Sequence, residues 1–174
     1  MKDELRKKYL DIRNSIKDRT KKSNIIKDKI INTIEYQTSK VIALYKNLDS
    51  EVETNELINY ALKDNKVVVL PKIVGKTLEF YKTDNKKFNK NIYNIYEPVE
   101  TDIVNDIDLF IVPGICFDKY KNRVGFGKGY YDRALKTNGK KIGICFEEQI
   151  YDERIKVDPF DIKMDKIITE EKIY

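Results

Sequence analysis

Three glycines at alternate positions, Gly125, Gly127 and Gly129, constrain this chain more than any other feature. They follow a short apolar run over 108–113 that ends in Pro-Gly and predicts a buried strand leading into a loop. Beyond them, residues 130–136 have helical character, and Gly139 is placed to end that helix. Backbone without Cβ atoms can turn tightly and bring several N–H groups against an anion, and a helix end adds partial positive charge. The sequence therefore predicts a phosphate-binding loop at a strand-to-helix crossing.

Charged and aromatic side chains at fixed offsets strengthen this interpretation. Arg123 and Lys128 would supply a planar fork and a point charge to the anion. Asp132, in the first turn of the expected helix, suits the magnesium ion that accompanies a nucleoside triphosphate. The spacing matches neither a P-loop nor the G-x-G-x-x-G fingerprint, and the glycines alone fit a tight turn before a capped helix equally well. With these charges and Tyr130 and Tyr131 alongside, a ligand-binding loop is favoured.

Helical stripes that alternate with short apolar runs predict an α/β fold. The first expected helix carries Leu5, Tyr9, Ile12 and Ile16, and the second carries Ile26, Ile30 and Ile34. We expect strands at 41–45, 67–70, 108–112, 141–146 and 166–169, a peripheral strand at 78–82, and a helix at 55–62 capped by Thr54. Strands separated by helices and short loops predict a mostly parallel sheet with helices on both faces, whereas residues 84–101 show no clear pattern.

Composition favours one domain without membrane segments. No linker rich in Pro, Gly or Ser divides the 174 residues, so we expect residues 1–174 to form a single domain. The charged N-terminus and the lack of a long apolar run predict no signal segment and no membrane span, and hence a cytoplasmic location. Cys116 and Cys145 each lie in an apolar G-I-C-F segment, and the chain has no histidine. The usual zinc frameworks are excluded, and both thiols are expected to be reduced and buried.

The charge balance suits anionic small molecules better than nucleic acid. Lys and Arg outnumber Asp and Glu by 34 to 29, which gives a formal net charge of +5. Both signs are interspersed, so most of these charges are expected on a solvated surface. Because there is no basic stripe and no recognition motif, we expect no nucleic-acid partner.

The segments P-G-I-C-F-D and N-R-V-G-F-G-K-G-Y-Y-D strongly resemble the signature of the 5-formyltetrahydrofolate cyclo-ligase family. Shorter matches occur in the family's order along nearly the whole chain: K-x-x-x-R at Lys2 and Arg6, then segments at 35–40, 49–54, 146–150 and 161–169. The resemblance implies a three-layer α/β/α, Rossmann-like domain. It also implies conversion of 5-formyltetrahydrofolate and ATP into 5,10-methenyltetrahydrofolate, ADP and phosphate. We expect a monomer, and the preference for polyglutamylated folate stays open.

The resemblance also implies which residues meet each ligand. ATP would be bound by Lys2, Arg6, Arg123, Gly125, Gly127, Lys128, Gly129, Tyr130 and Tyr131. The folate would be bound by Lys46, Glu51, Phe126, Gly127, Lys128, Gly129 and Tyr130. Asp132 and Asp161 would hold Mg²⁺, directly or through water, while Arg123, Lys128 and Asp132 would be catalytic. Glu51 would accept hydrogen bonds from the pterin N–H groups.

Some points remain open at this level. This chain has Phe160-Asp161 where many family members have His-Asp, and Ile155-Lys156 lacks a frequent Leu-Pro, which affects the expected geometry of the metal site. Tyr130 and Tyr131 could stack on ligand rings or pack the helix against the sheet.

The nearest alternative function is an ATP-dependent kinase or ligase acting on another small anion. A silent nucleotide-binding module and a basic RNA-binding protein are more distant alternatives.

Overall fold

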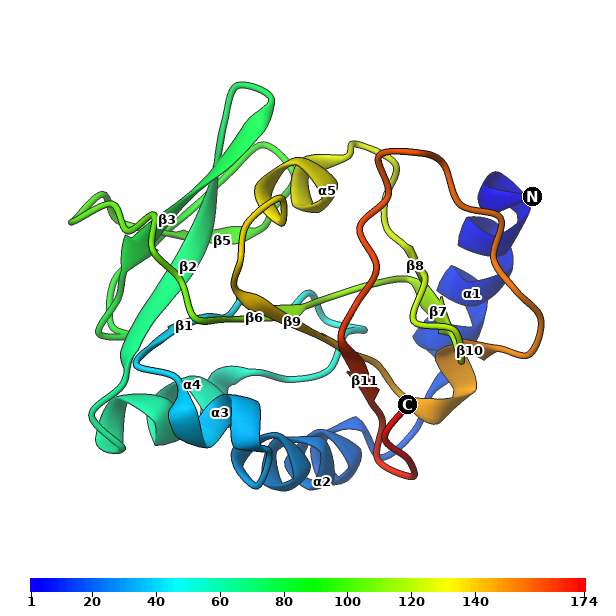
Figure 1. Cartoon of the computed structure of the whole chain (residues 1–174), viewed down its shortest axis with the longest axis horizontal. Coiled ribbons are helices and arrows are strands. Elements are labelled where there is room, and N and C mark those ends of the chain that lie inside the picture. Colours follow the sequence, from blue (N-terminus) through cyan, green and yellow to red (C-terminus); the bar gives the residue numbers. More distant parts are fainter.

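The computed structural model describes all 174 residues and has a six-stranded sheet at its centre, with strand order β11-β9-β6-β1-β2-β3 (Figure 1). The strands are β1 (Val41–Ala43), β2 (Val67–Val74), β3 (Thr77–Lys82), β6 (Leu109–Val112), β9 (Lys140–Ile144) and β11 (Lys166–Ile168). All neighbours pair in parallel except β3, which runs antiparallel to β2 at the edge. The predicted α/β fold with a mostly parallel sheet is confirmed, and so is the peripheral strand.

Helices cover one face of this sheet, seen below it in Figure 1. They are α2 (Arg19–Ile31), α3 (Ile34–Thr38) and α4 (Asn55–Lys63). Their apolar residues, such as Ile30 and Ile58, pack with Val68 and Leu70 of β2 in the largest core cluster. Because side chains alternate along a strand, Val69 joins the cluster on the other face.

The opposite face is covered by one short helix and by loops. Helix α5 (Tyr130–Ala134) lies above the sheet in Figure 1, and Leu135 at its end packs in the second core cluster with Phe110 and Phe117. Because this layer is thin, the segment that precedes α5 lies near the surface. No helix of the structure has the length and apolar character needed to cross a membrane.

Helix α1 (Lys2–Ser15) packs beside a second, small sheet, two of whose three strands precede α5 in the chain. This sheet consists of β10 (Ile150–Tyr151), β7 (Cys116–Asp118) and β8 (Arg123–Val124), with the 3-10 helix η1 (Glu147–Gln149) close to α1. Leu5 and Tyr9 of α1 are buried against Cys116 and Val124 in a third core cluster. This packing places α1 next to the segment that follows β8.

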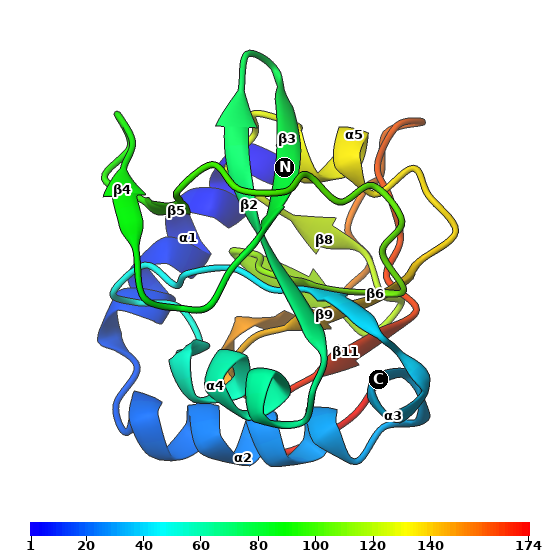
Figure 2. The same cartoon turned by 90° about the vertical axis from the view of Figure 1, so that its left-hand side faces the viewer.

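Residues 84–101, which gave no pattern, contain the β4 (Phe88–Lys90) and β5 (Tyr96–Pro98) hairpin. Figure 2 shows this hairpin beside the longer β2–β3 hairpin, which extends beyond the sheet.

Three local predictions were wrong. Ile34 is exposed because α2 ends at Ile31 and the chain restarts as α3, so the side chain leaves the apolar stripe. Thr54 stands at the N-cap of α4, but its hydroxyl donates to the carbonyl oxygen of Tyr45 instead of capping the helix. Helix α5 ends at Ala134, well before Gly139, which instead packs closely against Phe110 at the start of β9.

Candidate active site

The loops that carry the predicted site follow two neighbouring strands. β1 and β6 are adjacent and parallel, so their carboxyl ends meet at the same edge of the sheet. The chain after β1 carries Glu51, and the chain after β6 continues through β7 and β8 into the glycine loop, residues 125–129. Ligands of open α/β sheets bind at this kind of edge.

Helix α1 holds the glycine loop from one side. Arg6 Nε donates a hydrogen bond of 2.8 Å to the carbonyl oxygen of Gly125. Gly127 and Gly129 have φ of +89° and +69°, a left-handed backbone conformation that residues with a Cβ atom rarely adopt. Phe126 and Lys128, the two residues that alternate with the three glycines, are exposed and available to a ligand. The loop therefore forms the predicted tight turn, and its binding of an anion stays a prediction.

Arg123 lies beneath the loop and reaches Asp132. Its Nη1 donates to the carbonyl oxygen of Pro113 at 3.2 Å, and its Nη2 lies 3.4 Å from Asp132 Oδ2. The guanidinium carbon is 5.5 Å from the centre of the Tyr131 ring, and the buried Nε has no hydrogen-bond partner. The structure therefore brings together the predicted cation and the predicted carboxylate.

Asp132 also meets the C-terminal segment that contains Asp161. Asp132 Oδ1 accepts a 3.1 Å hydrogen bond from the N–H of Ile162, so the two predicted metal ligands come from adjoining segments. The carboxylate of Asp161 accepts from the N–H of Asp158 at 2.7 Å and from Lys2 Nζ. Burial lowers the pKa of Lys2, but its hydrogen bonds to the two aspartates outweigh this effect and leave the pKa raised.

This pair of carboxylates suits magnesium. Both side chains are partly exposed, at 23% for Asp132 and 19% for Asp161, and both offer hard oxygen donors. No group of three potential ligands among His, Cys, Asp and Glu is present. Mg²⁺ needs no such group because it commonly uses one or two carboxylates together with water and substrate phosphates. The donor set therefore fits a nucleotide-bound Mg²⁺ better than a site built from protein ligands alone.

Glu51 is buried, with only 6% of its surface exposed, and accepts a 2.8 Å hydrogen bond from the N–H of Leu48. Its second oxygen lies 3.6 Å from Nη1 of Arg13, a residue that the sequence analysis did not identify. Burial raises the pKa of Glu51, while Arg13 and the Leu48 N–H act in the opposite direction. The guanidinium of Arg13 also lies 5.6 Å from the centre of the Phe126 ring. Arg13 thus faces residues from both loops of the candidate site.

A signal for Arg13 was present in the sequence. It follows Leu5 and Tyr9 at intervals of four residues, so it lies on the buried face of α1. An arginine on an apolar helical stripe requires a polar partner inside the protein, and the sequence does not show which carboxylate that is.

The remaining predicted residues lie around these centres in different ways. Tyr131 packs against the second core cluster, whereas Tyr130 lies beside Arg133 near the surface. Lys46 is in the same loop as Glu51, but its Nζ donates to the side chains of Asn55 and Asn85, at 3.2 and 3.1 Å. Burial lowers the pKa of Lys46.

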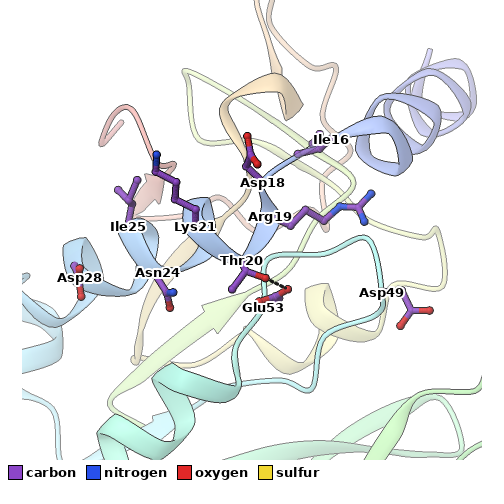
Figure 3. A pocket seen from close by; sticks show the side chains of 10 residues that line it. All are labelled: Ile16, Asp18, Arg19, Thr20, Lys21, Asn24, Ile25, Asp28, Asp49 and Glu53. Atoms are coloured by element: carbon purple, nitrogen blue, oxygen red, sulfur yellow. Dashed lines mark hydrogen bonds between the residues drawn. The ribbon is translucent and has the colours of Figure 1, made fainter.

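A separate cavity of about 940 Å³ lies between the start of α2 and the loop after β1 (Figure 3). Its lining is mainly polar and includes Arg19, Asp49 and Glu53, and Thr20 donates a 2.9 Å hydrogen bond to Glu53 across it. None of the predicted site residues lines this cavity. It is therefore distinct from the candidate active site.

Comparisons with known proteins identify the family to which this chain belongs. The sequence model of the 5-formyltetrahydrofolate cyclo-ligase family matches residues 1–170. A probable 5-formyltetrahydrofolate cyclo-ligase of Schizosaccharomyces pombe is 36% identical over 168 residues, 83% of this chain and 81% of that protein. The mouse 5-formyltetrahydrofolate cyclo-ligase is 30% identical over 176 residues, 90% of this chain and 86% of that protein.

Solved structures of related proteins share the fold. The 5,10-methenyltetrahydrofolate synthetase of Aquifex aeolicus superposes with a TM-score of 0.87 at 35% identity, over 99% of this chain and 91% of that chain. The corresponding synthetase of Mycoplasma pneumoniae gives a TM-score of 0.79 at 28% identity, over 97% of this chain and 98% of that chain.

Proposed function

Because the chain belongs to the 5-formyltetrahydrofolate cyclo-ligase family, we propose that it converts 5-formyltetrahydrofolate and ATP into 5,10-methenyltetrahydrofolate, ADP and phosphate. The protein is accordingly an ATP-dependent ligase. Residues 1–174 act as one cyclo-ligase domain, an interpretation supported by a family match that spans 1–170.

The chemistry requires activation of an unreactive oxygen. The formyl group on N5 is an amide, and its oxygen must be lost from the carbon for N10 to close the ring, although it is a poor leaving group until it is activated. The γ-phosphoryl group of ATP is transferred to that oxygen, which releases ADP. N10 then attacks the activated carbon, loses its proton, and expels the oxygen as phosphate. The substrate supplies the nucleophile, so the protein needs only to position the two ligands and neutralise charge.

The residues of the glycine loop suit the phosphoryl transfer. Arg123 and Lys128 would offset negative charge on the transferred group, while the backbone of Gly125, Gly127 and Gly129 approaches the triphosphate. Lys2 and Arg6 would contact the nucleotide from α1, in agreement with the hydrogen bond from Arg6 to the loop. Asp132 and Asp161 would hold Mg²⁺, which supplies charge neutralisation of the phosphates when bound.

The loop after β1 suits the folate. Glu51 would accept hydrogen bonds from the pterin N–H groups, and Phe126 and Tyr130 would line the same ligand from the glycine loop. Lys46 would border the folate site at its outer side. We also infer a cytoplasmic monomer with no nucleic-acid or membrane partner, and the interspersed charges support the lack of a nucleic-acid partner.

The observation that carries this proposal is the meeting of Arg123, Asp132 and the glycine loop beside the buried carboxylate of Glu51 in a chain of this family. Protein mixed with magnesium-ATP and 5-formyltetrahydrofolate should produce the near-ultraviolet absorbance of the methenyl product. Hydrolysis of ATP without that absorbance, in the presence of active folate, would instead favour a kinase or ligase for another small anion.

A further inference from the structure

Arg13 is the most unusual buried charge in this protein. Its side chain is only 3% exposed, although it carries five N–H donors. Nε donates to Ser50 Oγ at 2.9 Å, whereas the buried Nη1 has no hydrogen-bond partner. A buried guanidinium is costly unless its donors are satisfied. A role limited to holding the fold together would favour a closer pair than the 3.6 Å between Nη1 and Glu51 Oε1.

The surroundings of Arg13 connect the two loops of the candidate site. Ser50 and Glu51 belong to the loop after β1, and Phe126 belongs to the glycine loop. The guanidinium lies 5.6 Å from the Phe126 ring centre, within the range of a cation–π interaction. Phe126 is 52% exposed, so a ligand can reach the ring while Arg13 supports it from within.

We propose that Arg13 is a positioning residue for folate recognition, which keeps Glu51 ionised and aimed at the pterin and fixes Phe126 of the glycine loop relative to it. This inference rests on the proposed function, because the pterin is the group that Glu51 would bind. Glu51 Oε2 is already used by the Leu48 N–H, whereas Oε1, which Arg13 faces at 3.6 Å, accepts no hydrogen bond and is available to a further donor. Arg13 thereby acts through Glu51 and Phe126 rather than on the reacting atoms.

The charge of Glu51 gives this role a pH signature. The titratable groups that face Glu51 are Arg13, Tyr45 and Tyr131, and of these only Arg13 is a cation. Burial raises the pKa of Glu51, and Arg13 lowers it. Without Arg13 the pKa of Glu51 rises further, so the carboxyl gains its proton at a higher pH, and one of its two oxygens then becomes a hydrogen-bond donor. Folate binding should then weaken as pH falls, over a range where the wild type still binds.

The test compares Arg13→Gln and Arg13→Lys with the wild type and with Arg19→Gln. Arg19 is a matched control because its guanidinium contacts the carbonyl oxygens of Arg13 and Asn14 at the end of α1 and faces no carboxylate of the site. We expect Arg13→Gln to raise KM for 5-formyltetrahydrofolate by about 10- to 100-fold, with KM for ATP changed less than about twofold. The increase in KM for 5-formyltetrahydrofolate, relative to the wild type, should become larger as pH is lowered from about 8.5 to 6. The rate of product formation without enzyme is subtracted at each pH.

Two further variants separate positioning from general packing. Glu51→Gln should abolish the pH dependence, and the double variant Arg13→Gln with Glu51→Gln should cost less than the two single changes added together. Arg13→Lys keeps the charge but not the planar fork, so it should retain the wild-type pH profile with an intermediate KM. If Arg13→Gln does not fold, as judged by thermal melting, Arg13→Lys decides: a raised KM for 5-formyltetrahydrofolate with KM for ATP almost unchanged supports the inference, and equal rises in both overturn it.

Equal rises in KM for both ligands, or the same result for Arg13→Gln and Arg19→Gln, would show that Arg13 is only structural and would overturn the inference. Equilibrium binding of 5-formyltetrahydrofolate without ATP distinguishes this failure from failure of the proposed function. Wild-type protein that binds folate without forming product would contradict the proposed reaction and still show the predicted difference with Arg13→Gln. Wild-type protein that does not bind folate would overturn both.

Discussion

Arg6 donates its Nε hydrogen to the carbonyl oxygen of Gly125 at 2.8 Å, although 119 positions separate the two residues in the chain. The N-terminal helix is therefore a structural support of the glycine loop. The same guanidinium lies 3.2 Å from the point that a Cβ on Gly127 would occupy, so the loop is closely fitted to α1. A side chain at Gly127 would disturb the backbone and this support together.

We expect Gly127→Ala to weaken ATP binding by about tenfold or more, since φ of +89° strains a residue with a Cβ and the added atom presses on Arg6. Calorimetric titration with a non-hydrolysable ATP analogue would measure the change. Gly75→Ala is the matched control, because Gly75 also has positive φ, of +61°, but nothing lies within 4 Å of its Cβ position in the β2–β3 turn. Unchanged nucleotide affinity in Gly127→Ala would mean that the loop does not contact phosphate there.

Asp132→Asn should reduce turnover by about two orders of magnitude or more while the fold is retained, because the change removes a charge but almost no volume. Activity measured against magnesium concentration should show the largest loss when the ion is limiting. Asp28→Asn, on the exposed side of α2, removes the same charge away from the site and should leave turnover unchanged. Normal turnover of Asp132→Asn at limiting magnesium would show that Asp132 has only a structural role, as a partner of Arg123 and of the Ile162 N–H.

Two substitutions should separate the binding sites. Glu51→Gln should weaken the binding of 5-formyltetrahydrofolate by about 10- to 100-fold, because the carboxylate that accepts hydrogen bonds from N–H groups is lost. Arg123→Ala should instead impair ATP binding or phosphoryl transfer, by about 10²- to 10³-fold in turnover. Binding of each ligand is measured separately, with the exposed Arg154→Ala as a control for loss of an arginine. If either variant weakens both ligands equally, the two assignments are wrong.

The regular part of the fold was predictable because it depends on local periodicity. Apolar runs in β1, β2, β6, β9 and β11 are buried on both faces of a parallel sheet, and such strands are recognisable by composition alone. The hairpin of β4 and β5 was missed because its strands are three residues each and have little apolar character, β4 being mostly exposed, so neither length nor alternation marks them. The end of α2 was missed because Ile34 continues its spacing, although the chain turns at Asn32 and Thr33.

From the pattern of residues alone, the candidate site was predictable only where its members are close together in the sequence, whereas the distant members came from the family resemblance. Gly125, Gly127 and Asp132 form one segment, and the positive φ of Gly127 follows from the need for a tight turn. The contacts of Arg6 with Gly125, and of Arg13 with Glu51, depend on how α1 docks against two loops. Periodicity places Leu5, Tyr9 and Arg13 on one buried face but does not identify what that face meets.

The last prediction is that no protein side chain becomes covalently modified during turnover. The chain has no histidine, and its only two thiols, Cys116 and Cys145, are buried and free. Burial raises the pKa of Cys116 to about 12 and that of Cys145 well above its ordinary value, so neither forms an appreciable amount of thiolate near neutral pH. We therefore expect the formyl oxygen to receive the phosphoryl group directly from ATP. Replacing both cysteines by Ala should lower stability by about 1 kcal/mol or more per site, with the rate of the chemical step almost unchanged. Protein incubated with γ-labelled ATP alone should carry no acid-stable or base-stable label, whereas stoichiometric label that 5-formyltetrahydrofolate then releases as phosphate would contradict direct transfer.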